Sequence, residues 1–226
     1  MPGSCPISTF AKFFLAPFCP ITKSIFRKVF KIEVYGLENI PQSPCIVASN
    51  HRSHLDPPVL NAVFPQNLWF LAKEELFKIP ILGRLLPHMG ALPVKRGSGD
   101  LEVLELAMEL MHFGCKVCIF PEGTRARPGE FLKPKLGVGL LAIKSQRPVL
   151  PVYIEGTDIV FPKGAKFPKP GHPIRVFIGK GKVYHGEENP REYRRVAEEI
   201  MESIKELAYA SAEGFTEDTS TRSASI

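Results

Sequence analysis

The sequence predicts an α/β fold: a mixed, largely parallel central sheet of about seven strands with helices on both faces. Two observations support this prediction. Short apolar runs rich in Val, Ile and Phe alternate along the chain with segments of helical periodicity. Polar clusters directly follow several of these runs, as happens where strands end in open α/β sheets. With 226 residues, of which 44% are hydrophobic, the chain can bury the core of one domain.

The expected strands are unbroken or alternating apolar runs bounded by Gly, Pro or polar turns. Residues 31–35 alternate and end at Gly36, whereas residues 68–72 are apolar throughout, which is typical of a strand buried on both faces. The seven expected strands span residues 31–35, 45–48, 68–72, 91–94, 117–120, 149–154 and 174–178.

The expected helices are recognised by apolar residues at three- and four-residue spacing and by residues that favour helix ends. Pro57 and Pro58 can open a helix, since proline is tolerated in a first turn. Asn189 and Pro190 provide the N-cap and first residue of a long C-terminal helix. The expected helices span residues 56–64, 73–88 (as one or two short helices), 100–113, 133–145 and 189–209.

The two ends of the chain differ in composition from the α/β domain expected over 32–210. Residues 1–31 carry five basic residues, no acidic residue and many phenylalanines, which is typical of helices lying in a membrane interface. We expect an amphipathic helical hairpin over 6–16 and 20–31, too short and too interrupted to span a bilayer. An ordinary hairpin packed on the core is the alternative. Residues 211–226 are rich in Ser, Thr and acidic residues, which predicts a disordered tail.

The composition limits the classes of partner that the protein can be expected to bind. Its formal net charge of +6 suits a phosphorylated substrate, an anionic membrane or nucleic acid, and charge alone does not separate these. Combined with the N-terminal segment, it favours a membrane surface, and we expect no nucleic-acid partner. The five cysteines are odd in number and dispersed, which predicts reduced thiols in a cytosolic environment.

The most informative stretch places two histidines and an aspartate directly after the strand expected at 45–48. His51 can serve as a general base with Asp56 orienting its ring, a pair that activates a hydroxyl or a water. His51, His54 and Asp56 can alternatively bind a metal, or simply form a turn that caps the next helix. The spacing differs from the HxHxDH pattern of zinc hydrolases and no second ligand pair accompanies it, so we expect no metal and no cofactor.

Two more polar clusters follow expected strands, one at residues 95–96 and one at 122–127. If these strands are parallel neighbours, all three clusters open on one edge of the sheet. Cations beside a glycine turn with free backbone amides favour a phosphate, although each cation alone can also be an ordinary surface charge. Glu122 fits a phosphate poorly and can instead hold an arginine or bond a loop amide. The predicted phosphate-binding set is Lys95, Arg96, Glu122, Gly123, Thr124 and Arg125.

The order of these segments resembles the glycerolipid acyltransferases. Residues 50–56 match the NHxxxxD pattern of that family, and residues 120–125 match its FPEGTR block. Residues 90–96 look like the intervening block that ends in a basic residue, and residues 149–156 look like the fourth block, with a proline inside a strand. The first and third blocks are specific, whereas the other two would be weak alone. In size the chain is similar to bacterial 1-acyl-sn-glycerol-3-phosphate acyltransferases, but it lacks an obvious transmembrane helix.

The resemblance implies transfer of a fatty acyl group from a thioester of coenzyme A or acyl carrier protein to the sn-2 hydroxyl of lysophosphatidic acid, giving phosphatidic acid. It assigns His51 as general base and Asp56 as its partner, and it places the acceptor's phosphate on Arg125 with Lys95 or Arg96. The thioester is then a co-substrate, and no covalent acyl-enzyme is implied. We expect a peripheral, monotopic protein at the cytoplasmic face of the cell membrane.

Two alternatives to the transferase remain at this stage. A thioester or phosphate-ester hydrolase would use the same His51 and Asp56 to activate water in place of an alcohol. A non-enzymatic protein that binds anionic lipid through residues 1–31 would not need His51 at all. Analysis of the reaction products separates the first alternative from a transferase, and substitution of His51 tests the second.

Overall fold

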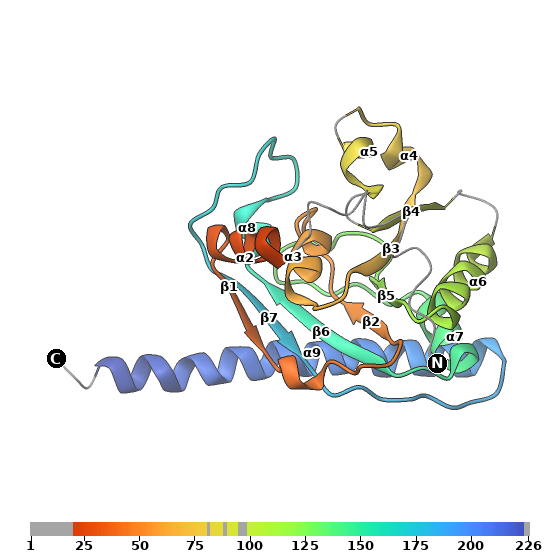
Figure 1. Ribbon diagram of the computed structural model, residues 1–226. Coiled ribbons are helices and arrows are strands. Elements are labelled where there is room, and N and C mark those ends of the chain that lie inside the picture. The colour runs from red at the N-terminus through yellow and green to blue at the C-terminus, as the bar shows by residue number, and fades with distance from the viewer. Residues whose placement is uncertain (1–19, 81, 88–89, 95–98, 224–226) are drawn as a thin grey trace.

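The computed structural model describes residues 20–80, 82–87, 90–94 and 99–223. Over these residues a single seven-stranded mixed sheet carries helices on both faces (Figure 1), so the predicted α/β fold is confirmed. The strands are β1 Ile32–Tyr35, β2 Ile46–Ser49, β3 Leu68–Lys73, β4 Ala91–Val94, β5 Lys116–Ile119, β6 Val149–Glu155 and β7 Ile174–Ile178. The helices are α2 Pro20–Val29, η2 Leu37–Asn39, α3 Asp56–Val63, α4 Glu74–Phe77, α5 Leu82–Leu85, α6 Gly99–His112, α7 Leu136–Ser145, α8 Thr157–Val160 and α9 Pro190–Ser223.

The order of strands across the sheet is β1-β7-β6-β2-β5-β3-β4. The five strands from β6 to β4 are parallel, whereas β7 pairs with β6 in the antiparallel sense and β1 pairs with β7 in parallel. Strands β6, β2 and β5 are therefore parallel neighbours at the centre of the sheet. Their carboxyl ends meet at one edge, which is the arrangement that the polar clusters require.

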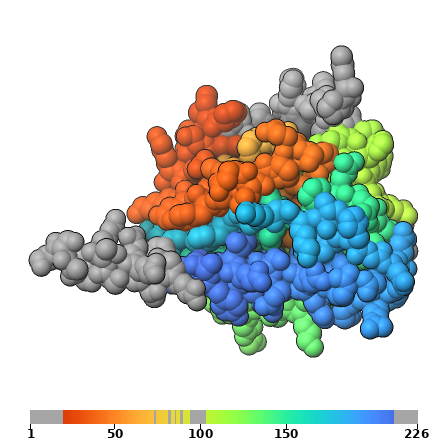
Figure 2. All heavy atoms as spheres, turned by 90° about the horizontal axis from the view of Figure 1, so that it is seen from below, coloured from red at the N-terminus to blue at the C-terminus, as the bar shows by residue number. Residues whose placement is uncertain are grey.

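Two apolar cores lie on opposite faces of the sheet because successive side chains of a strand point to opposite sides. In β2, Val47 packs with α3 on one face, whereas Ile46 and Ala48 pack with α6, α7 and α9 on the other. Helix α2 joins the first core through Phe26, and Phe30 packs there directly after the helix ends. Seen from below, the blue surface of α9 extends along one side of the molecule, with α2 in red at the opposite edge of the view (Figure 2).

Helices α7 and α9 differ from their expected limits by several residues. Helix α7 begins at Leu136 instead of 133, because Lys135 has an extended backbone with a ψ of 151° and Pro134 precedes it. Helix α9 continues to Ser223, so the structure has helix over 211–223 where the sequence led us to expect disorder. Alanines in the stretch after Tyr209 favour helix, and the Ser211 hydroxyl bonds to a carbonyl one turn earlier within it.

The predicted N-terminal helical hairpin can be compared with the structure only over its second helix. Helix α2 corresponds to the second helix of the predicted hairpin, whereas the first, over 6–16, lies outside the described residues. Among the helices that the structure describes, none combines the length and the apolar character needed to cross a bilayer. Cys45 and Cys118 are free and buried in the core, but Cys115 is disulfide-bonded, so the prediction of reduced thiols is wrong at that position.

Candidate active site

Two of the three polar clusters predicted from the sequence, those after β2 and β5, lie at the carboxyl edge of adjacent parallel strands, whereas the third, Lys95 and Arg96, lies outside the described residues. Strand β2 lies between β5 and β6. Residues 50–56 follow β2, residues 120–126 follow β5 and residues 156–157 follow β6. Short turns after β2 and β5 hold His51 and Glu122, and Thr157 opens α8 just after β6. The sheet order therefore brings together residues that lie up to about a hundred positions apart in the chain.

His51 and Asp56 form the hydrogen-bonded pair expected from their spacing. The His51 Nδ1 lies 2.8 Å from the Asp56 Oδ2. That oxygen also accepts the backbone N–H groups of Arg52 at 2.7 Å and Ser53 at 2.8 Å. The other carboxylate oxygen, Oδ1, accepts the Thr157 hydroxyl at 2.6 Å. Asp56 is buried, and four donors hold its charge, so its position is fixed relative to the imidazole.

The His51 ring is presented to the edge of the sheet in one orientation. Its side chain is 17% exposed, and it stacks on the Phe120 ring with 4.1 Å between the ring centroids. Because the Asp56 carboxylate only accepts hydrogen bonds, the proton of a neutral imidazole lies on Nδ1. The lone pair of Nε2 is then available to take a proton from a bound hydroxyl or water.

The backbone of His51 is fixed from both neighbouring strands. Its N–H donates to the Glu122 Oε1 at 3.1 Å, and its carbonyl accepts the N–H of Ala126 at 2.8 Å. One residue earlier, the Asn50 side chain donates to the Ile154 carbonyl at 2.9 Å and accepts the Ile154 N–H at 2.7 Å. The Asn50 amide thus imitates a backbone group and continues the pairing of β2 with β6 past the end of the strand.

Glu122 lies beneath this turn with both oxygens engaged. Its Oε1 accepts the N–H of His51, its Oε2 accepts the N–H of Leu132 at 2.8 Å, and only 1% of the residue is exposed. Burial raises the pKa of Glu122, while the two N–H donors oppose that rise. The geometry therefore agrees with the expected bond to a loop amide, and it directs neither oxygen toward a ligand.

Replacing Glu122 by Gln is expected to lower the free energy of unfolding by about 1–3 kcal/mol, because an NH₂ group would face one of the two buried N–H donors. Denaturant unfolding of both proteins measures the difference. Glu130→Gln, an exposed glutamate in the following loop, is the matched control and should change stability by less than about 0.5 kcal/mol. Equal stabilities of Glu122→Gln and Glu130→Gln would show that the two bonds contribute nothing.

The turn after β5 carries the predicted phosphate ligands Gly123, Thr124 and Arg125. Gly123 and Thr124 are exposed, and Arg125 is half-buried. Arg125 directly precedes Ala126, whose N–H donates to the His51 carbonyl. Desolvation, together with the charges of Arg125 and His51, lowers the pKa of His54. Gly123 has a φ of 67°, a left-handed backbone conformation that residues with a side chain rarely adopt.

The remaining predicted residues divide as follows. Lys95 and Arg96 lie outside the described residues, directly after β4. His54 is exposed, beside but not part of the His51–Asp56 pair. Within the described ranges no group of three or more His, Cys, Asp or Glu side chains is arranged to hold a metal ion.

Three residues of the site were not identified from the sequence. Thr157 bonds Asp56, Phe120 stacks on His51, and Arg52 is buried with its guanidinium 5.1 Å from the centroid of the Phe131 ring. Arg52 also donates to the Tyr153 hydroxyl at 3.3 Å. Thr157 lies two residues after the end of β6, and that position could have indicated a site residue. The two ring contacts depend on packing that the sequence does not specify.

Comparison with known proteins assigns this arrangement to a family. The family model described as Acyltransferase matches residues 31–155, more than half of the chain, and includes His51, Asp56 and the turn after β5. The chain belongs to the acyltransferase family. The predicted resemblance, made on the blocks at 50–56 and 120–125, is thereby confirmed.

Several individual acyltransferases are similar to this chain. It is 36% identical over 155 residues to a chloroplastic 1-acyl-sn-glycerol-3-phosphate acyltransferase of Brassica napus, covering 67% of this chain and 45% of that protein. A 1-acyl-sn-glycerol-3-phosphate acyltransferase of Pseudomonas aeruginosa is 34% identical over 160 residues, covering 70% and 61%. The chain thus spans less than two thirds of the length of either relative.

A solved acyltransferase structure shares the fold over nearly its whole length. The crystal structure of the 1-acyl-sn-glycerophosphate acyltransferase PlsC from Thermotoga maritima superposes with a TM-score of 0.65 at 28% sequence identity. The match covers 89% of this chain and 90% of that one. The α/β architecture described above is therefore that of a known member of the acyltransferase family.

Proposed function

We propose that this protein transfers a fatty acyl group from a thioester to the sn-2 hydroxyl of lysophosphatidic acid, making phosphatidic acid. The observation that carries the proposal is the His51–Asp56 pair, which leaves the Nε2 of a partly exposed imidazole as a base. The relatives named 1-acyl-sn-glycerol-3-phosphate acyltransferase supply the acceptor. The donor is the thioester of coenzyme A or of acyl carrier protein.

His51 acts first, by removing the proton of the acceptor hydroxyl. Its Nε2 takes that proton as the hydroxyl oxygen attacks the carbonyl carbon of the thioester. The imidazolium that forms lies against the buried Asp56 carboxylate, which stabilises the positive charge and keeps the ring from turning. The stack on Phe120 restrains the same ring from its face.

The second half of the reaction expels the thiol. The tetrahedral intermediate collapses, the carbon–sulfur bond breaks, and the departing sulfur receives the proton held on His51. The products are phosphatidic acid and the free thiol of the carrier, so the base is regenerated without a covalent acyl-enzyme. General base catalysis of this kind contributes about 10²- to 10⁴-fold to the rate.

The acceptor's phosphate is held by the turn after β5 in this proposal. Arg125 offers a guanidinium, and the exposed residue Thr124 an amide donor, on the same edge as His51, whereas the Gly123 N–H already donates to the Phe120 carbonyl at 3.0 Å. Lys95 and Arg96 add two further cations in the assignment made from the sequence. Fixing the phosphate positions the sn-2 hydroxyl beside the base, and such positioning lowers the barrier further.

The same proposal places the protein on the cytoplasmic face of the cell membrane as a peripheral protein. Its support is α2, in which Ile21, Ile25 and Val29 are 71%, 56% and 49% exposed. Side chains four residues apart share one face of a helix, so these three form a continuous apolar stripe. The same helix carries the basic residues Lys23, Arg27 and Lys28 off this stripe, and an apolar face combined with basic residues is the composition of an interfacial helix.

The direct test incubates the full chain in detergent with lysophosphatidic acid and palmitoyl-coenzyme A, then separates the lipid products. We expect phosphatidic acid and an equal amount of free coenzyme A. A parallel reaction with palmitoyl–acyl carrier protein compares the two donors. Free fatty acid without phosphatidic acid would contradict the transferase and establish the hydrolase instead. No product with either donor and several lysolipid acceptors would exclude glycerolipid acyl transfer.

A further inference from the structure

The buried side of the catalytic pair ends at a hydroxyl that the mechanism above does not use. Thr157 is 1% exposed, and its Oγ1 donates to the Asp56 Oδ1 at 2.6 Å. The other carboxylate oxygen, Oδ2, faces His51. Within the described ranges of the chain Thr157 is the sole donor to Oδ1, whereas Oδ2 has three donors. One hydroxyl therefore holds the half of the carboxylate that points away from the imidazole.

The backbone that carries this hydroxyl is fixed by a glycine turn at the end of β6. Gly156 has a φ of 87°, and a Cβ at that position would lie 2.5 Å from the Pro173 carbonyl oxygen. Only glycine fits there without a shift of the backbone. Helix α8 begins directly afterwards, and the Thr157 carbonyl accepts the Phe161 N–H at 2.8 Å. The hydroxyl thus approaches Asp56 from a position that β6 and α8 determine together.

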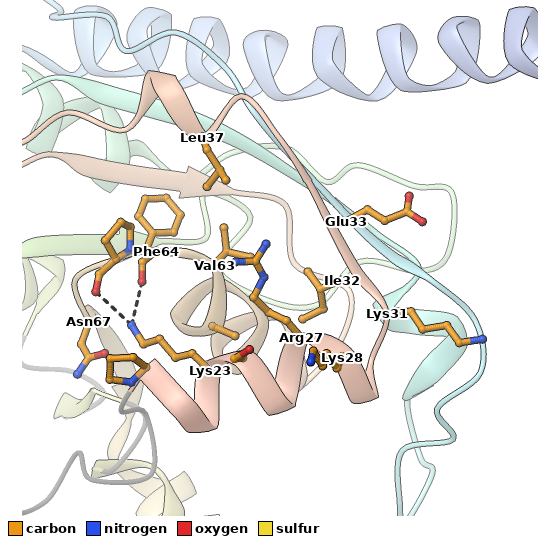
Figure 3. Close-up of a pocket in the computed structure, with 14 residues that line it drawn as sticks. Lys23, Arg27, Lys28, Lys31, Ile32, Glu33, Leu37, Val63, Phe64 and Asn67 are labelled. Atoms are coloured by element: carbon orange, nitrogen blue, oxygen red, sulfur yellow. Dashed lines mark hydrogen bonds between the residues drawn. The ribbon is translucent and has the colours of Figure 1, made fainter.

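The backbone of Asp56 is held separately, at the start of α3. Seven of the eight residues of this helix are buried. Figure 3 shows its far end attached to α2, where the Lys23 Nζ donates to the Phe64 carbonyl at 2.8 Å. Three bonds then fix Oδ2, but a carboxylate held at one oxygen can still pivot about it. The bond from Thr157 fixes the second oxygen and with it the plane of the carboxylate.

We propose that Thr157 is a positioning residue for acyl transfer, and that its hydroxyl fixes the plane of the Asp56 carboxylate and takes up part of its negative charge. Since an ionised carboxylate only accepts hydrogen bonds, the Thr157 hydroxyl is the donor. His51, Asp56 and Thr157 then form one chain of hydrogen bonds from the turn after β2 to the turn after β6. The inference rests on the proposed function, in which His51 is the base.

Other ionisable groups lie near the pair, and substitution of Thr157 leaves all of them in place. They are His54 and Arg52 of the turn after β2, Cys118 of β5, Glu122 and Arg125 of the loop after β5, and Asp158 of α8. Burial, followed by the charge of Asp56, raises the pKa of the Cys118 thiol well above its usual value, so this thiol is uncharged at neutral pH. A difference in pH dependence between Thr157 variants therefore reports the His51–Asp56 pair.

Thr157→Val removes the donor and keeps the branched shape of the side chain. The carboxylate then keeps more of its charge on Oδ2 and stabilises the protonated imidazole more strongly. Because the base acts as the neutral ring, the acidic limb of kcat/KM should move to higher pH by roughly half a pH unit. The carboxylate can also pivot, so kcat at the optimum should fall about tenfold. KM for both substrates should stay within twofold, since the buried Thr157 contacts neither.

The measurement is formation of phosphatidic acid from lysophosphatidic acid and palmitoyl-coenzyme A across a range of pH, with the full chain and its variants. Thr157→Ser keeps the hydroxyl and should restore most of the rate and the original acidic limb. Thr157→Ala removes the same donor and replaces a Thr157→Val protein that fails to fold. The control is Ser203→Ala, which removes a half-buried hydroxyl that donates to the Glu199 carbonyl at 3.1 Å within α9 and should change neither quantity.

Four results would overturn the inference. The first is a folded Thr157→Val protein with unchanged kcat and pH profile. The second is a loss of rate that Thr157→Ser shares, because the methyl group and not the hydroxyl would then be responsible. The third is a rise in KM alone, which would make Thr157 a substrate contact. The fourth is a loss of rate with an unmoved acidic limb, which would leave Thr157 a structural role only.

NMR of the histidine rings separates this inference from the proposed function, because it needs no substrate. The signal of His51 is assigned by its absence from His51→Ala protein. In Thr157→Val the pH midpoint of that signal should move upward, in the same sense as the acidic limb, and an unmoved midpoint would overturn the inference. If the unsubstituted chain makes no phosphatidic acid, the proposed function fails, while the NMR comparison still decides whether Thr157 acts on the pair.

Discussion

Substitution of His51 by alanine is expected to lower the rate of acyl transfer by about 10²- to 10⁴-fold, because the reaction loses its general base. The fold should survive, since the bonds that hold this turn come from the backbone of His51 and not from its ring. The measurement is initial formation of phosphatidic acid from lysophosphatidic acid and palmitoyl-coenzyme A, with thermal unfolding followed on the same samples.

His185→Ala is the matched control for this experiment. His185 is exposed in the loop before α9, where only its carbonyl is engaged, so the rate should stay within twofold of the unsubstituted protein. A His51→Ala protein that is folded and retains more than about a tenth of the activity would contradict the assignment of the base. The reaction would then depend on positioning of the two substrates alone.

Substitution of Asp56 by asparagine is expected to reduce activity by about 10³- to 10⁴-fold while preserving most of the contacts around it. The amide oxygen can take the place of Oδ2 and accept from the Arg52 and Ser53 N–H groups. The amide NH₂ can then donate to the Thr157 hydroxyl, which accepts as well as donates. What is lost is the negative charge beside His51, and with it the stabilisation of the imidazolium.

The control here is Asp158→Asn, which removes one carboxylate from α8 near the same edge of the sheet. Its activity should be nearly unchanged. Unfolding of Asp56→Asn should be easier by about 1–3 kcal/mol, since bonds to a charged acceptor become bonds to a neutral one. A folded Asp56→Asn protein with near-normal activity would mean that the aspartate only shapes the turn.

Much of the site could be predicted because its signals are local. His51 and Asp56 lie five positions apart, directly after an apolar run, and the bond between them spans one turn of chain. The glycine turn after β5 is equally local, since its positive φ at Gly123 accompanies a short segment of polar residues. Strand ends were recognisable from the switch between apolar and polar residues, so the clusters after β2 and β5 could be expected at one edge if their strands were parallel neighbours.

The features of the fold and site that could not be predicted depend on pairing between distant segments of the chain. That β6 lies beside β2 is fixed by hydrogen bonds between residues about a hundred positions apart, and from this neighbour Thr157 reaches Asp56. The reversed direction of β1 and β7 likewise has no local signature. Glu122 presented a different difficulty, because the same residue type can face a ligand or lie buried under a turn, and only packing decides between them.

The bonds that fix the backbone around His51 have a consequence for turnover. Asn50 attaches the turn to β6, while Glu122 and Ala126 attach it to the loop after β5, so the imidazole is carried on a backbone as restrained as the sheet itself. The conformational entropy of ordering the base is therefore lost once, when the protein folds. Each incoming acceptor meets a preorganised proton acceptor, and its binding energy remains available for orienting the acceptor and the thioester.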